Sequence, residues 1–178
     1  KLLEIKAIKL NRSQPFTWAS GWKSPIYCDN RKSLSYPAVR TFIKMAICEQ
    51  IKLHYPDVEV IAGVATAGIP QGALVAEELG LPFVYVRSKP KGHGMENLIE
   101  GEVNPNSKVV VIEDLVSTGG SSLKAVEDLR NAKANILGMV AIFTYGFQIA
   151  QDNFEKSNVK LLTLSNYSDM LPIALEKT

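Results

Sequence analysis

The sequence predicts an α/β fold in which helices flank a central, mainly parallel sheet. Short apolar runs rich in β-branched residues alternate along the chain with segments of helical periodicity, a pattern typical of strands joined by right-handed crossover helices. One run, Val109–Ile112, has four consecutive apolar residues, as expected for a strand buried on both faces. The 178 residues contain no repeat or linker. We therefore predict a single domain over residues 1–178 with a sizeable core.

The first 35 residues are predicted to form a small N-terminal hood. Residues 1–10 have apolar positions at the spacing of a short amphipathic helix. Residues 16–31 contain two short aromatic-rich segments around Ser20-Gly21, which predict a hairpin or small flap. From Tyr36 to about Leu53, apolar residues recur every three or four positions, so we expect a long helix that packs on the core.

A strand, a loop of small residues and a helix are expected next. The strand is Val58–Ile61, the loop is Ala62–Gly68, and the helix runs from Ile69 to Leu79 and stops at Gly80. The start of such a helix is open to an anion. Ordinary α/β connectivity explains most loops of this kind, so on its own the unit is a weak indication of a site.

A third strand, Pro82–Arg87, leads into a long segment without hydrophobic periodicity. Residues 88–106 are polar, basic and rich in glycine at first, which predicts a mobile loop. Loops of this length in compact domains are often functional lids. After the central strand and its helix we expect a strand at 135–144, a helix at 148–156, a strand at 159–164 and a short helix from Asn166.

The central strand leads directly into a set of polar residues that suits a phosphorylated sugar. Glu113 and Asp114 accept hydrogen bonds, so they match a ribose diol or a hydrated Mg²⁺ beside it. A Ser/Thr/Gly loop follows, and then a helix whose first N–H groups favour a phosphate. Gly119 and Gly120 let the backbone approach that anion. A lone Asp-x-x-x-Thr-Gly would be explained equally well by turn and cap residues, but the unbroken run argues for a ligand.

The run from Val109 to Ser122 resembles the phosphoribosyl-pyrophosphate (PRPP) signature of type I phosphoribosyltransferases. PRPP loses pyrophosphate when its C1–O bond breaks, so a catalyst needs cations over the leaving group. Arg87, Lys89, Lys91 and His93 alternate along the loop and point to one side in an extended chain. With Mg²⁺ they would neutralise the pyrophosphate. His93, with a reference pKa of about 6.5, would be charged or would donate a proton. The alternative interpretation is that these charged side chains only face solvent and bind no ligand.

Nearly the whole chain resembles the orotate phosphoribosyltransferase family. Three stretches carry the resemblance: Ser20–Tyr27, Arg87–Gly94 and Glu113–Ser122. The resemblance implies the type I phosphoribosyltransferase fold with a flexible catalytic loop, Mg²⁺ dependence, the formation of orotidine 5′-monophosphate in pyrimidine biosynthesis, and a homodimer with shared active sites. By resemblance, Arg87, Lys91 and His93 bind pyrophosphate, largely in the partner's site. The ribose 5-phosphate would be held by Glu113, Asp114, Leu115, Val116, Ser117, Thr118, Gly119, Gly120 and Ser121, and orotate would contact Ser117 and Lys23.

The sequence departs from this family pattern at two places. Some members have a second Lys directly after the loop Arg, where this chain has Ser88, and Lys89 would then supply that charge. Some members grip the base with an Arg after the strand that follows the PRPP helix, where this chain reads Thr144–Phe147 without an Arg. The carboxylate of orotate would then be held by Arg31, by Lys23 or by backbone amides of the hood.

Composition and missing motifs exclude several other classes of protein. The net charge of +2 is too small to predict a nucleic-acid or membrane surface. The chain has no dinucleotide fingerprint and no P-loop. Cys28 and Cys48 are isolated, so we expect no cysteine metal site and a reducing, cytoplasmic setting. No secretion signal or membrane span is expected, and Lys1 indicates that an initiating Met is missing.

Two rival functions remain open at this point. A phosphoribosyltransferase for a purine or another pyrimidine would have a neutral base pocket, whereas Lys23 and Arg31 suit an anionic base. A PRPP-sensing regulator would add a nucleic-acid-binding face and could lose the loop cations. This chain keeps those cations and has no added DNA-binding segment, so the enzyme is the favoured interpretation.

Overall fold

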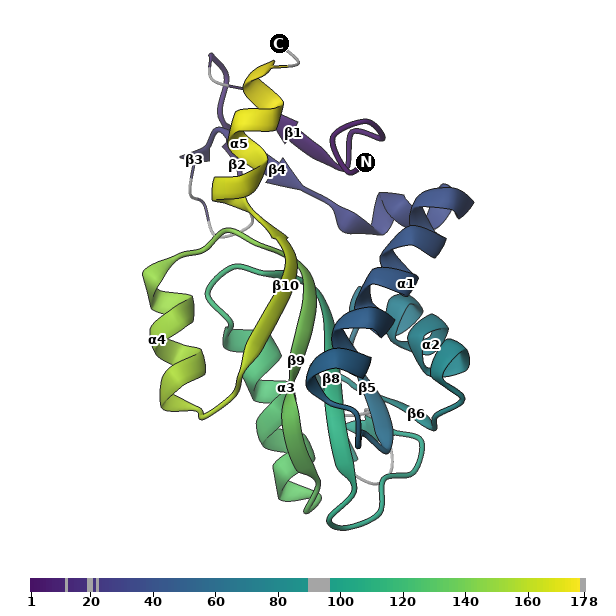
Figure 1. The fold of residues 1–178 in the computed structure, drawn as a ribbon. Coiled ribbons are helices and arrows are strands. Elements are labelled where there is room, and N and C mark those ends of the chain that lie inside the picture. The colour runs from purple at the N-terminus through teal and green to yellow at the C-terminus, as the bar shows by residue number, and fades with distance from the viewer. Residues whose placement is uncertain (12, 19–20, 22, 90–96, 177–178) are drawn as a thin grey trace.

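The computed structural model describes residues 1–11, 13–18, 21, 23–89 and 97–176. Its centre is a six-stranded sheet in the order β10-β9-β8-β5-β6-β7 (Figure 1). All neighbouring strands are parallel except β6 and β7. This confirms the predicted α/β class with a mainly parallel sheet. The strands are β5 (Val60–Val64), β6 (Phe83–Val86), β7 (Ile99–Glu100), β8 (Lys108–Val116), β9 (Asn135–Thr144) and β10 (Leu161–Asn166).

Helices cover both faces of the sheet. The helices α1 (Pro37–His54) and α2 (Gly68–Leu79) share one apolar cluster with the sheet. The helices α3 (Gly120–Asn131) and α4 (Gln148–Lys156) share another cluster on the opposite face. The last helix, α5 (Tyr167–Glu176), packs with the hood in a third cluster. None of the described helices is long and apolar enough to cross a bilayer.

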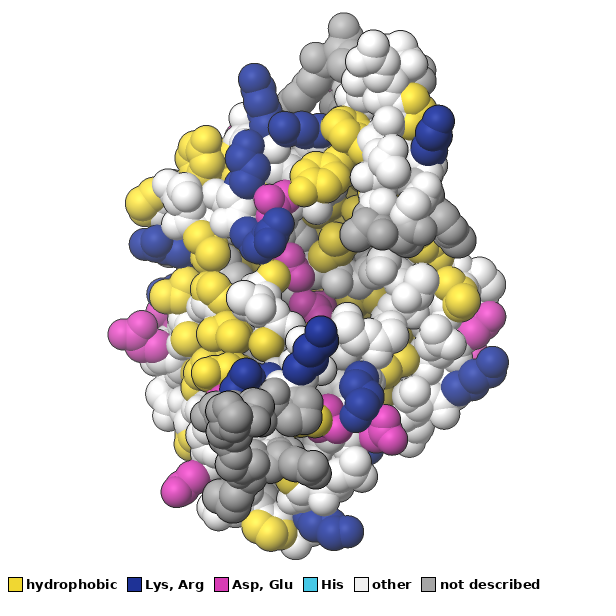
Figure 2. All heavy atoms as spheres, turned by 180° about the vertical axis from the view of Figure 1, so that it is seen from behind, with side chains coloured by type: hydrophobic (Ala, Val, Ile, Leu, Met, Phe, Trp, Pro, Cys, Tyr) yellow, Lys and Arg dark blue, Asp and Glu magenta, His cyan; other side chains and the backbone are white. Residues whose placement is uncertain are grey.

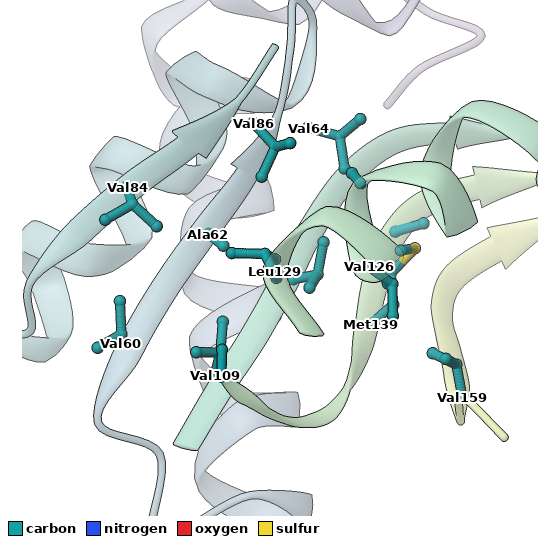
Figure 3. Close-up of a cluster of buried hydrophobic side chains, with 14 of the residues drawn as sticks. Val60, Ala62, Val64, Val84, Val86, Val109, Val126, Leu129, Met139 and Val159 are labelled. Atoms are coloured by element: carbon teal, nitrogen blue, oxygen red, sulfur yellow. The ribbon is translucent and has the colours of Figure 1, made fainter. Parts of the chain in front are cut away.

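Strand β8 joins the two main clusters because its side chains alternate between the faces of the sheet. Val109 and Val111 belong to the cluster under α3 and α4, which Figure 3 shows around Val126 and Leu129. Val110 and Ile112 belong to the cluster under α1 and α2. All four apolar residues of the run are fully buried. The prediction of a strand buried on both faces is thus confirmed.

The hood consists of two short antiparallel strand pairs and a 3-10 helix. Strand β1 (Ile8–Leu10) pairs with β4 (Ile26–Cys28), and β2 (Phe16–Thr17) pairs with β3 (Lys23–Ser24). The second pair confirms the hairpin expected in this region. The 3-10 helix η1 (Asn30–Ser35) connects the hood to α1.

The helix expected at residues 1–10 is wrong, because these residues form turns followed by β1. A segment this short nucleates a helix poorly. Pairing with β4 instead satisfies its backbone, since the Asp29 N–H donates to the Ala7 carbonyl at 2.8 Å and the Asn11 N–H to the Pro25 carbonyl at 2.8 Å. Lys6 has a φ of 55°, which does not fit a right-handed helix.

Three predicted boundaries also need correction. Strand β5 begins two residues later than expected and extends to Val64, where it pairs with Val86 of β6. Strand β8 does not end before Glu113; it extends to Val116, because β9 continues beside it and pairs with residues 113, 115 and 116. The predicted loop 88–106 contains β7, whose Ile99 is buried against the core. A strand of two residues has no periodicity to reveal it.

Candidate active site

A cavity of about 310 Å³ lies where the hood meets the carboxyl ends of β5 and β8. In parallel α/β sheets this edge is the usual place for a ligand. On the face drawn in Figure 2, acidic side chains lie in a row, with Lys and Arg side chains beside them. The residues that line the cavity are Cys28, Asp29, Arg31, Ala65, Thr66, Ala67, Glu113, Asp114, Leu115 and Ser121.

Glu113 is the buried member of the carboxylate pair and is 5% exposed. Its Oε2 accepts a hydrogen bond from Ser122 Oγ at 2.8 Å, and its Oε1 accepts one from the Asp114 N–H at 2.9 Å. Burial, together with the neighbouring Asp114 charge, raises the pKa of Glu113 to about 8. Glu113 therefore holds a proton at neutral pH. Its two hydrogen bonds connect its side chain to the main chain of β8 and to Ser122 of α3.

Asp114 carries the negative charge of the pair. Burial raises the pKa of its carboxyl, whereas a hydrogen bond from Glu113 and the backbone N–H of Leu115 oppose that rise. Its main chain is held on both sides, because the N–H donates to Glu113 and the carbonyl accepts from Asn30 Nδ2 at 2.7 Å. The arrangement presents the Asp114 carboxyl to the cavity as a hydrogen-bonding group on a fixed main chain.

Replacing Glu113 by Gln should flatten the pH dependence of stability in magnesium-free buffer. A folded-state pKa raised from 4.5 to about 8 means that folding is favoured at low pH and that this advantage is lost as the pH rises through that range. We expect the urea-unfolding free energy of the unsubstituted protein to fall from pH 5 to pH 8.5 relative to Glu113→Gln, by at least about 1 kcal/mol. Carboxyl groups that do not interact with Glu113 are common to both proteins and cancel in the difference, so the difference reports the titration of Glu113 together with Asp114. Parallel curves for the two proteins would contradict this assignment.

The loop from Ser117 to Gly119 connects β8 to α3. Gly119 has a φ of +84°, and a Cβ there would lie 2.7 Å from Cε2 of Phe154. Both the backbone conformation and the packing of α4 therefore require glycine. Helix α3 begins at Gly120 without a side-chain cap, so its first N–H groups remain available to an anion. Asn153 Nδ2 fixes the loop from α4 by donating to the Thr118 carbonyl at 3.0 Å.

A second loop, Ala65–Ala67, faces the same cavity from the end of β5. Close backbone packing places it there, because a Cβ on Gly68 would lie 2.6 Å from the Ile112 carbonyl oxygen. The Ala65 N–H donates to the Val86 carbonyl at 2.9 Å, and the peptide bond between Ala65 and Thr66 is cis. These residues were not predicted as site residues. Their only signal in the sequence is the run of small residues at a strand–helix junction.

The positively charged side chains that were predicted as site residues do not all line the cavity. Arg31 lines the cavity, and its Nε donates to Asp29 Oδ1 at 2.7 Å, which lowers the pKa of Asp29. Lys23 is exposed on β3, outside the lining. Arg87 pairs with Glu100 on β7, with 3.3 Å between Nη1 and Oε1.

The remaining predicted residues lie around the cavity or outside the described chain. Glu113, Asp114, Leu115 and Ser121 line it together with Arg31. Five predicted residues do not line it: Val116 ends β8, Gly120 begins α3, and the turn between them consists of Ser117, Thr118 and Gly119. Lys89 is exposed just past Arg87. Lys91 and His93, with Gly92 and Gly94, lie outside the described residues.

An aromatic cluster occupies the position after β9 where an Arg was considered. Tyr145 stacks on Phe147 with ring centroids 5.5 Å apart, and the Trp18 ring lies 4.7 Å from that of Tyr145. The Trp18 indole N–H donates to the Ile26 carbonyl at 3.0 Å. This segment therefore attaches the hood to the sheet by apolar contact, a role that the sequence did not reveal.

Comparisons with known proteins show which sequences and structures the chain is similar to. Residues 38–169 match the family model described as "Phosphoribosyl transferase domain". The chain is 65% identical to a Porphyromonas gingivalis protein named orotate phosphoribosyltransferase, over 98% of this chain and 83% of that protein. It is 64% identical to the protein of that name from Phocaeicola vulgatus, over 99% and 83%. The crystal structure of orotate phosphoribosyltransferase from Aeropyrum pernix superimposes with a TM-score of 0.86 at 28% identity, covering 97% of this chain and 95% of that one.

Proposed function

The chain belongs to the phosphoribosyltransferase family and, within it, to the orotate phosphoribosyltransferases, and from this premise we propose which of its residues carry out each part of the reaction. The enzyme transfers the ribose 5-phosphate of PRPP to orotate and so forms orotidine 5′-monophosphate and pyrophosphate in pyrimidine biosynthesis. The observation that carries the assignment of residues is the cavity in which Asp114, Ser121 and Arg31 meet.

We place the ribose 5-phosphate along β8 and α3. Asp114 accepts hydrogen bonds from the ribose hydroxyls, since it lines the cavity at the end of β8, beside the start of α3. The 5-phosphate accepts hydrogen bonds from the backbone N–H groups between Ser117 and Ser121, at the start of α3, where the helix has no side-chain cap. Protonated Glu113 does not contact the sugar; it fixes the main chain of Asp114 through its hydrogen bond to the N–H.

We place the pyrophosphate between the 65–67 loop and the cations that follow β6. Cleavage of the C1–O bond moves negative charge onto the pyrophosphate while a nitrogen of the base forms its bond to C1. Arg87, Lys89, Lys91 and His93 supply positive charge or a proton to that leaving group. Closure of the part of this loop that precedes β7 over the substrates excludes water from the electron-poor ribosyl centre.

We propose that Mg²⁺ arrives with the substrate. The described residues contain no group of three or more His, Cys, Asp or Glu side chains that could hold a metal ion. Both oxygens of Glu113 are occupied by hydrogen bonds, which leaves Asp114 as the single protein carboxylate on that side. Oxygens of PRPP then provide most of the ligands, in keeping with the preference of Mg²⁺ for substrate phosphates and water. The ion supplies charge neutralisation at the pyrophosphate.

We assign the recognition of orotate to Arg31, Lys23 and Ser117. Arg31 is supported by its place at the cavity and by its planar, bidentate donor geometry, which matches a carboxylate. Lys23 lies on β3 and Ser117 directly follows β8, and neither lines the cavity. The aromatic segment after β9 contains no Arg or Lys. Arg31 is the only Arg or Lys among the residues that line the described cavity.

Arg31→Ala should raise KM for orotate by about tenfold or more, the effect of losing one charge-assisted hydrogen bond. KM for PRPP should change much less. The matched control is Lys32→Ala, which removes the adjacent cation, whose Nζ donates to the Lys6 carbonyl at 3.2 Å and which does not line the cavity. Unchanged orotate kinetics in Arg31→Ala would move the carboxylate contact to Lys23 or to backbone amides.

The activity itself is tested by the ultraviolet absorbance of orotate with enzyme, PRPP and Mg²⁺. Loss of the orotate band is expected, whereas adenine, hypoxanthine and uracil should show no PRPP-dependent turnover. Turnover of a neutral base in place of orotate would favour the rival phosphoribosyltransferase. PRPP binding without turnover of any base would favour a regulator.

We also propose that the enzyme is a cytoplasmic homodimer of single-domain chains. The hood of each chain covers residues 1–35, and the catalytic loop lies between β6 and β7 and reaches into the partner's site. The two cysteines are both free and buried, in keeping with a reducing compartment. We propose no nucleic-acid or membrane partner.

A further inference from the structure

Asn30 connects the hood to the carboxylate strand through its side chain. It is the first residue of η1, and it is 1% exposed. Its Nδ2 donates to the carbonyl of Asp114 at 2.7 Å, across 84 positions of sequence. Its Oδ1 accepts a hydrogen bond from the Cys28 thiol at 3.3 Å. Both ends of the amide are therefore satisfied inside the protein, as a buried polar group requires.

The direction of these bonds makes an amide necessary at this position. The Asp114 carbonyl can only accept, so the group that faces it must be a donor. The Cys28 thiol donates to the other end, so that end must be an acceptor. Asn satisfies both, whereas a carboxylate would place a second acceptor against the Asp114 carbonyl. The main chain of Asn30 is also fixed, because Ser33 Oγ donates to its carbonyl at 2.6 Å.

The residues on either side of this bond are those that face the cavity. Cys28, Asp29 and Arg31 line it from the hood, and Asp114 lines it from β8. Asn30 itself does not line the cavity. The Glu113 side chain holds the N–H of Asp114 and Asn30 holds its carbonyl, so these two side chains set the orientation of residue 114.

We propose that Asn30 is a positioning residue that couples the orotate side of the site to the PRPP side. It holds Asp114 for the ribose and, through the adjacent main chain, Arg31 for the carboxylate of the base. This inference rests on the proposed function, because it takes Asp114 and Arg31 to be substrate contacts. Loss of the Asn30 bond then weakens the binding of both substrates, although Asn30 contacts neither.

The test compares Asn30→Asp and Asn30→Ala with Arg40→Ala in steady-state kinetics. Asn30→Asp keeps the size of the side chain and remains informative if Asn30→Ala fails to fold. Both substitutions are expected to raise KM for PRPP and KM for orotate together by about tenfold, with a smaller fall in kcat. Arg40→Ala removes a hydrogen bond to the same 3-10 helix, since Arg40 Nη1 donates to the Leu34 carbonyl at 3.0 Å, and it leaves both bonds of the Asn30 amide in place. It should leave both constants within about twofold of the unsubstituted enzyme, a difference that corresponds to less than about 0.5 kcal/mol.

Three outcomes would overturn the coupling. The first is unchanged KM values in Asn30→Asp, and the second is a rise in only one of them. The third is an equal rise in both for Arg40→Ala, which would indicate general loosening of η1. The unsubstituted enzyme separates this failure from that of the proposed function. If it turns over orotate while Asn30→Asp behaves identically, only the coupling is wrong; if it does not turn over orotate, the proposed function and the coupling are both wrong.

Discussion

Asp114→Asn is expected to lower kcat/KM for PRPP by about a hundredfold or more, equivalent to about 2.7 kcal/mol of transition-state stabilisation. The substitution keeps the shape of the side chain and removes its charge. An ionised acceptor that binds two hydroxyl groups makes charge-assisted hydrogen bonds worth about 1.5–3 kcal/mol each. The amide would also present a donor to the ribose or to a hydrated cation. The measurement is the initial rate at saturating orotate and Mg²⁺ over a range of PRPP concentrations.

A second acidic residue gives the matched control for this prediction. Asp57 lies at the amino end of the sheet, where its carboxylate pairs with Lys108 Nζ at 2.7 Å. Asp57→Asn also removes one negative charge, so it reports any general effect of net charge on PRPP binding. We expect its kinetics to match those of the unsubstituted enzyme. Near-normal PRPP kinetics in Asp114→Asn would refute the role of Asp114 as the ribose acceptor.

Lys91→Ala is expected to lower kcat by about 10²–10³-fold, the usual cost of removing one fixed group that faces developing charge. Negative charge grows on the pyrophosphate as the C1–O bond breaks, so a cation there interacts more strongly with the transition state than with the bound substrate. KM for PRPP should therefore change less than kcat. The control is Lys156→Ala on α4, and equal losses of kcat in both variants would contradict the proposal.

A mixture of inactive variants tests whether Lys91 acts across a dimer. In a hybrid of one Lys91→Ala chain and one Asp114→Asn chain, one of the two sites combines an intact Asp114 with an intact loop from the other chain. Random assembly makes about half of the dimers hybrids, so the mixture should recover about a quarter of the unsubstituted activity. The absence of any recovery, with subunit exchange verified, would place Lys91 in the site of its own chain.

The parts of the site that lie together in sequence were predictable. The apolar run, the carboxylate pair and the Gly-rich turn follow one another within Val109–Ser122, so a single strand–loop–helix pattern contains them all. Long elements such as α1 and β9 were equally visible, because each repeats its periodicity over many residues. Helix α4 begins and ends where the sequence predicted.

Features that depend on distant contacts were not predictable in the same way. The position of β8's end follows from its partner β9, which continues beside it. The bond between Asn30 and Asp114 joins segments that only the folded chain brings together. Arg31 was considered on the ground of its charge, but its place at the cavity depends on how η1 packs against β8. Local patterns carry no information about such contacts.

The extension of β8 has a consequence for the energetics of substrate capture. Because Glu113 and Asp114 belong to a hydrogen-bonded ladder beside β9, their oxygens occupy fixed positions before the sugar arrives. The protein groups on this side of the site therefore lose little conformational entropy when the substrate binds. Little of the interaction free energy is then offset by the cost of ordering them. The central sheet thus works as a preorganised template for the part of the site that β8 forms.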